Sequence, residues 1–187
     1  SVENRYRADA SKVVITRGYP SIHGCDVLSE RIEALKSFAI AAFGRFDVSM
    51  KDIKEAELEW RPDVEANNIR WILTHLSNQW NVGFHRTFRG DNDYKPAGWP
   101  DDYVGSKTIT YSKLMDDLTR GRASVLEGLN KLKPADLAIE VQSPSGLVKR
   151  YDRLIRQMSE IIHHEGQIAY IRGVIARKAK KDSRFLS

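Results

Sequence analysis

Residues 151–178 read YDRLIRQMSEIIHHEGQIAYIRGVIARK and carry the clearest structural pattern of this chain. Apolar side chains recur in this stretch every three, four or seven residues: Leu154, Ile161, Ile168, Ile171 and Ile175. An α-helix turns about 100° per residue, so this spacing places them on one stripe of a helix. The stretch therefore predicts a long amphipathic helix with one face that must be buried.

Three further helices are predicted upstream by the same spacing. The first begins near Asp26, which we expect to cap it. The second covers about 67–88, with Asn67 or Asn68 as its cap, and the third ends at Lys131. Four helices that each carry one apolar stripe bury those stripes most simply by packing together. We therefore predict an all-α fold, an up-down four-helix bundle.

The connections between the predicted helices differ in kind. Residues 89–107, RGDNDYKPAGWPDDYVGSK, form a long loop between the second and third helices. Loops of this length are usually functional or disordered, and we interpret this one as a lid. Alternating side chains around Pro144 and Gly146 predict a small hairpin before the last helix. Residues 13–15 could form a short N-terminal strand.

Composition and length indicate one globular domain. The chain has 187 residues, of which 41% are hydrophobic and 29% charged. We divide it into an N-terminal arm (1–25), the bundle (26–178) and a basic C-terminal tail (179–187). No apolar run approaches the roughly 20 residues of a membrane span, and the polar start lacks the apolar stretch of a secretory signal. We therefore expect no membrane association and a cytoplasmic location.

The basic residues are concentrated at one end of the chain. The formal net charge is +5, and the residues from Arg172 onward account for all of it, so residues 1–171 are neutral overall. Cations near a helix C-terminus are favoured by the helix dipole. We interpret the segment as a basic helix end with a solvated tail, and we expect no nucleic-acid partner.

Two histidines are predicted to face the interior of the bundle. On the last helix His164 lies at the centre of the apolar stripe, and Glu160, four residues earlier, lies on the same side. His163 is rotated by a further 100° and should point to solvent or to a neighbouring subunit. On the second helix His75 stands at the border of the apolar face.

These positions leave two interpretations open. In the first, Glu160 pairs with a basic side chain such as Arg156 or Arg122, and the histidines are ordinary core or rim residues. In the second, His75, Glu160 and His164 hold a metal ion. Two histidines and one carboxylate with a vacant fourth position form a catalytic rather than a structural zinc pattern. The same donors would accept Ni, Fe or Mn. With only Cys25 in the chain, neither a disulfide nor a cysteine-based cluster can form within it.

Two segments resemble the signature helices of the DinB/YfiT-like superfamily of metal-binding four-helix bundles. They are NNIRWILTHLSNQW (67–80) and MSEIIHHEGQIAYIRG (158–173). An LEWRP turn (58–62) and KLKPADL (131–137) occur in the order that the resemblance implies. The resemblance covers most of 26–176. It implies a divalent metal held by three side chains near one end of the bundle, zinc or nickel first and iron or manganese as alternatives, and a homodimer.

The family's ligands can be carried over residue by residue. Its first histidine falls on His75 and its last on His164. Its middle ligand is usually a histidine, and Glu160 stands at that position here. His163 is the alternate ligand, which would need a local distortion of the helix. Gln167, one turn beyond His164, is a candidate pocket residue for a bound cosubstrate.

Members of this superfamily with assigned activities transfer low-molecular-weight thiols. The resemblance therefore implies an S-transferase-like enzyme in which the cosubstrate thiol binds at the open metal position. A metal lowers a thiol pKa from about 8.5, so the nucleophilic thiolate exists at neutral pH. Hydrolysis by a metal-bound hydroxide is the nearest variant. The alternative from another class is a non-catalytic metal-binding bundle with a stress or structural role.

Overall fold

The computed structural model describes residues 24–182 and 184–186. Its helices are α1 (Gly24–Met50), α2 (Ile69–Asn78), a π-helical turn η2 (Gln79–Gly83), α3 (Phe84–Arg89), α4 (Tyr111–Lys131) and α5 (Arg150–Ala179). Two short 3-10 turns are η1 (Glu55–Glu57) and η3 (Pro134–Ala138). Strands β1 (Glu140–Ser143) and β2 (Gly146–Lys149) form the expected small hairpin. Because α2, η2 and α3 follow one another without a break, the all-α four-helix bundle is confirmed.

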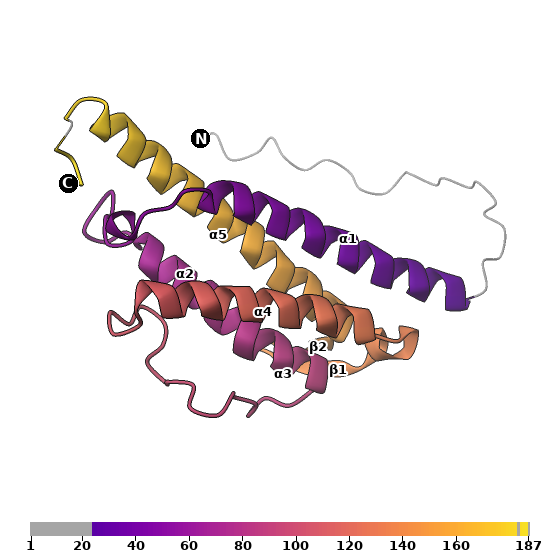
Figure 1. Ribbon diagram of the computed structural model, residues 1–187. Helices are drawn as coiled ribbons and strands as arrows, with labels where there is room; N and C mark the ends of the chain where they lie inside the picture. Colours follow the sequence, from indigo (N-terminus) through magenta and orange to yellow (C-terminus); the bar gives the residue numbers. More distant parts are fainter. Residues whose placement is uncertain (1–23, 183, 187) are drawn as a thin grey trace, which may run out of the picture.

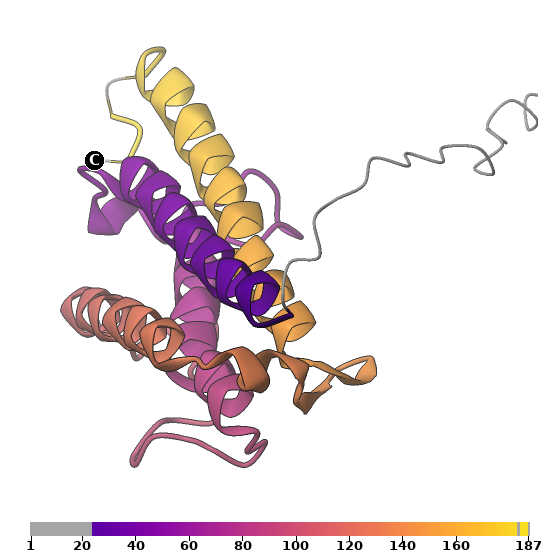
Figure 2. The same cartoon turned by 90° about the vertical axis from the view of Figure 1, so that its right-hand side faces the viewer.

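The order of packing explains the long loop. Helix α1 packs against α5 and α4, and α2 packs against α4 and α5. The loop after α3 carries the chain back along the bundle, so α4 runs in the same direction as α2 (Figure 1). Figure 2 shows α1 and α5 side by side. A strict up-down succession would place α4 antiparallel to α2, and the returning loop is the reason that it does not.

The helix boundaries follow local capping chemistry. The side chain of Asn68 accepts a hydrogen bond from the backbone N–H of Trp71, and that of Thr110 accepts one from the N–H of Lys113. Helix α1 begins at Gly24, so Asp26 lies inside its first turn and the expected cap at Asp26 is wrong. The predicted strand at 13–15, like residues 1–23 of the predicted arm, lies outside the described residues.

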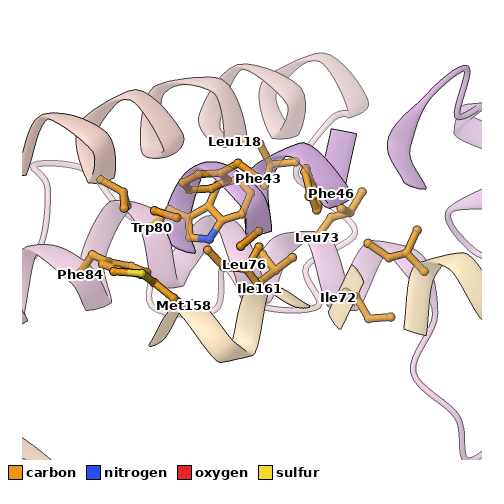
Figure 3. Close-up of a cluster of buried hydrophobic side chains, with 14 of the residues drawn as sticks. Phe43, Phe46, Ile72, Leu73, Leu76, Trp80, Phe84, Leu118, Met158 and Ile161 are labelled. Carbon is orange, nitrogen blue, oxygen red and sulfur yellow. The ribbon is translucent and has the colours of Figure 1, made fainter. Parts of the chain in front are cut away.

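The core is centred on Trp80, which η2 supplies. Its ring lies edge-on to Phe43 and Phe46 of α1, with centroid distances of 5.0 and 5.2 Å. Met158 and Ile161 of α5 belong to the same cluster (Figure 3). These side chains are at most 6% exposed. Apolar side chains of three different helical segments thus share one core. Among the described residues no helix is long and apolar enough to cross a bilayer.

The loop between α3 and α4 is anchored in its second half. Tyr103 is 1% exposed, and its hydroxyl lies 2.7 Å from Asp117 of α4 and 3.0 Å from Ser77 of α2. Trp99 stacks on Tyr103 and donates through Nε1 to Asn78. Burial raises the pKa of Tyr103, so its hydroxyl stays protonated and donates to Asp117. The prediction that this loop acts as a lid is untested, and the anchors show where it is held.

The C-terminal tail does not extend freely into solvent. Phe185 lies 5.9 Å from the ring of Trp60, and Lys178 lies within 6 Å of both rings. Phe185 and Leu186 are partly buried against the core. The expectation of a solvated tail is therefore wrong for this segment, because two apolar side chains among the charges have a surface to cover.

Candidate metal centre

One donor atom from each of His75, Glu160 and His164 comes together where α2 crosses α5. These three atoms lie within 4.8 Å of one another. The Nε2 atom of His164 is 3.5 Å from Oε2 of Glu160, and Nε2 of His75 is 4.0 Å from the same oxygen. The helical-wheel argument thus placed all three side chains on facing surfaces. We call them the donor cluster.

His75 is held in an orientation that leaves one nitrogen without a partner. Its ring stacks on Trp71, one turn earlier on α2, with an interplanar angle of 4°. Its Nε2 atom is buried and makes no hydrogen bond within the described part of the chain. Burial, and then the nearby His164, lower the pKa of His75, while Glu160 opposes that shift. His75 is therefore neutral at pH 7, the form that can bind a metal.

Gln167 determines which nitrogen of His164 carries the proton. Its Oε1 atom lies 2.8 Å from Nδ1 of His164, and its amide nitrogen lies 3.1 Å from Nε2 of His163. An amide oxygen only accepts, so Nδ1 of His164 donates and its Nε2 keeps a free lone pair toward the cluster. A second partner of this kind is typical of histidines that ligate metals. Gln167 therefore orients a donor, a more specific role than the general pocket residue that the sequence predicts.

The carboxylate of Glu160 is open to solvent. Its side chain is 52% exposed, although Glu160 lies on the same side of the helix as the buried His164. The alternative pairings are not formed, because Arg122 pairs with Asp47 and Arg156 donates to Ser145. The cluster therefore has the buried His164 and the partly buried His75 on one side and an approach from solvent on the other.

His163 is exposed and belongs to the outer side of the helix, as predicted. Its Nε2 faces Gln167 and is not part of the donor cluster.

The next residue after His164, Glu165, is 5% exposed and accepts hydrogen bonds from Ser49 and Arg45 of α1. This contact fixes α5 against α1 beside His164. Sequence periodicity missed it because a charged side chain does not count toward an apolar stripe.

The donor cluster fits a divalent ion. Donors bound to one zinc at about 2.1 Å lie roughly 3.4 Å apart in a tetrahedral arrangement, so small side-chain rotations would bring these atoms into range. The nitrogen of His75 without a partner and the fixed proton of His164 are what such a site requires. Two imidazoles and one carboxylate could hold the ion and leave further positions free for another ligand.

We expect the metal-free protein to lose stability as the pH falls below about 6.5. Burial lowers the pKa of both His75 and His85 below the ordinary 6.5. The unfolded chain takes up protons near the ordinary pKa while the folded chain resists, so protonation favours the unfolded state. The loss begins near 6.5 and ends below the folded pKa values. Urea midpoints from about pH 8 to about pH 5 measure it. His75→Gln should flatten the profile, and an unchanged slope would contradict this cause.

Comparison with known proteins agrees with this architecture. The sequence profile of the DinB superfamily matches residues 41–168, more than half of the chain. No curated protein matches the chain. Among solved structures, the crystal structure of the conserved protein of locus from Enterococcus faecalis shares 18% identity with a TM-score of 0.53. The match covers 75% of this chain and 94% of that chain. Likeness at this identity shows the fold alone.

Proposed function

Because this chain belongs to the DinB superfamily, we propose that it holds one divalent metal ion at its donor cluster and acts as a metal-dependent S-transferase for low-molecular-weight thiols. The observation that carries the proposal is the convergence of the donor atoms of His75, Glu160 and His164 within 4.8 Å. Zinc and nickel suit two imidazoles and a carboxylate, and iron or manganese are the alternatives.

The side chains around the cluster have separate roles in the proposed reaction. The bound ion would lower the pKa of a thiol that reaches it, so that the thiolate is the nucleophile at neutral pH. His75, stacked on Trp71, and His164, fixed by Gln167, hold their nitrogens in place before any ligand arrives. The half-exposed Glu160 leaves the approach from solvent open. The protein needs no nucleophile of its own.

Thiol-conjugation assays with metal-loaded protein test this proposal. Untagged protein is loaded in turn with zinc, nickel, iron or manganese and mixed with several thiols and electrophiles. The expected result is thiol-dependent turnover that stops on chelation and in His75→Ala. Turnover of esters or amides without thiol would favour metal-hydroxide hydrolysis instead. Stoichiometric metal without turnover of either kind would favour a non-catalytic bundle and contradict the proposal.

The proposed homodimer is tested separately. Analytical ultracentrifugation of the full chain at several concentrations would show a dimer that persists on dilution. A single species with the mass of one chain at all concentrations would contradict it.

A further inference from the structure

A polar pocket lies between α2–α3 and α5, and Asn78 and Gln79, which line it, follow His75 by three and four residues along the chain. Its volume is about 290 Å³, and residues of α2, η2, α3, the following loop, the hairpin and α5 line it. Its polar lining includes two guanidinium groups and four side-chain amides: Arg86, Arg153, Asn78, Gln79, Asn92 and Gln142. No acidic side chain is among the residues that line it. We call it the arginine pocket.

No carboxylate of the described residues is bound directly to either guanidinium group of the pocket. Arg86 donates from Nε to the backbone oxygen of Tyr94, which leaves its two terminal nitrogens available. In the part of the chain that the structure describes, neither Arg86 nor Arg153 forms an ion pair. Burial, and then the neighbouring Arg156, lower the pKa of Arg153, while the carboxylate of Glu160 opposes that shift. Two partly buried cations are costly when no anion binds them directly, and the charge of Glu160 offsets this cost for Arg153 only in part.

A buried amide lies between the arginine pocket and the donor cluster. Gln157 is 3% exposed, and within the described residues neither of its amide atoms has a hydrogen-bond partner. On α5 it stands four residues after Arg153 and three before Glu160, so all three share one face of the helix. Its nitrogen approaches Gly83, which lines the pocket, and would lie 3.4 Å from a Cβ there. Buried amides without partners are rare in native proteins and indicate a missing ligand or water.

We propose that the arginine pocket binds the oxyanionic end, carboxylate or phosphate, of a substrate whose other end reaches the donor cluster. Guanidinium groups bind such oxyanions through paired, charge-assisted hydrogen bonds. The binding of an anion by the pocket stands on the contacts above, whereas its connection to a reacting thiol rests on the proposed function.

The spacing along α5 sets the size of this substrate. Seven residues separate Arg153 from Glu160, a rise of about 10 Å in an α-helix. Three residues of extended peptide span roughly the same length. The substrate is therefore an acidic thiol of about tripeptide size, with its acidic group remote from the sulfur.

Anion binding to the metal-free protein tests the pocket by itself. The probes are S-methylglutathione, which has carboxylates but no free thiol, its diethyl ester, and inorganic phosphate. We expect saturable binding of S-methylglutathione by calorimetry, with shifts of the Nε–H signals of Arg86 and Arg153 in NMR spectra. The ester should not bind. Competition by phosphate would show that a phosphate group is also accepted, and its absence would restrict the pocket to carboxylates.

Matched arginine variants distinguish direct binding of the anion by a guanidinium group from a general effect of positive charge. Arg153→Gln and Arg86→Gln should each weaken binding roughly tenfold, the cost of one charge-assisted pair. Arg156→Gln removes the same charge one turn along α5, outside the pocket, and should change the affinity less than about twofold. Within the described residues Arg153 makes no side-chain hydrogen bond that the substitution would remove, so its variant should fold normally. Equal binding of acid and ester, or equal losses in all three variants, would overturn the proposal.

Steady-state kinetics distinguish this inference from the proposed function. If metal-loaded protein conjugates thiols, Arg153→Gln should raise KM for glutathione about tenfold and leave KM for uncharged 2-mercaptoethanol unchanged. Turnover with an unchanged KM for glutathione would overturn the connection between pocket and thiol while the proposed function stands. Absence of turnover would contradict the proposed function and leave the anion-binding result intact.

Discussion

Protein purified with His164→Ala is expected to contain less than about a tenth of the metal found in the wild type, because two remaining donors hold an ion far more weakly than three. His75→Ala should have the same effect, since it removes a buried Nε2 that has no hydrogen-bond partner among the described residues and is free to bind the ion. Gln167→Leu should weaken binding by about 10- to 100-fold without removing a donor, because Nδ1 of His164 loses its acceptor. Elemental analysis and competition with a chelator measure these effects.

Variants of the neighbouring residues assign the third donor. Glu160→Ala should lower the metal content, and full stoichiometry in that variant would remove the glutamate from the site while the histidines remain. His163→Ala should keep its metal, because its Nε2 faces Gln167, and a loss there would favour the alternate ligand. His85→Ala removes a part-buried histidine away from the cluster and serves as the matched control. Metal retained in both His75 and His164 variants would contradict the site.

Tyr103→Ala is expected to lower the free energy of unfolding by about 3–5 kcal/mol, the usual cost of truncating a fully buried aromatic ring. The ring is 1% exposed and carries the stacked Trp99 with it. Its loss should also release the loop after α3, so trypsin should cut faster at Lys107, whereas the bond after Lys95 precedes Pro96 and resists trypsin. Urea denaturation and limited proteolysis measure the two effects.

Tyr103→Phe separates the hydroxyl from the ring. The fully buried Asp117 would keep Lys113 and Arg120 as partners, so we expect a cost of only about 1 kcal/mol. Rapid cleavage of the loop in this variant would show that the hydrogen bond, and not the ring, anchors it. A Tyr103→Ala variant as stable as the wild type would contradict the anchoring role.

The parts of the fold that could be predicted are those carried by local periodicity. The apolar stripe of α5 and the border position of His75 follow from a regular turn per residue, and both hold in the structure. Asn68 could be predicted as the cap of α2, because its side chain bonds a backbone N–H only three residues further along the chain. The hairpin was likewise visible from adjacent residues.

The remaining features depend on residues far apart in the chain. The arginine pocket combines residues of six segments, from α2 to α5, so no short window of sequence contains it. Asp117 is buried because Tyr103, Lys113 and Arg120 satisfy it, and a periodicity argument assigns a charged residue to the surface. The π turn could not be predicted from the sequence, because the helical wheel assumes one constant rotation per residue.

The π turn at Gln79–Gly83 also limits how this site can be transplanted. It inserts the equivalent of one residue between His75 and Arg86, and one residue corresponds to about 100° of rotation. An engineer who grafts the histidines onto an idealised, uninterrupted helix would keep the donor cluster but turn Arg86 away from it. Scaffolds for this chemistry should therefore be chosen with the irregular turn in place, and alignments that close it as a gap would misassign every position up to Arg89.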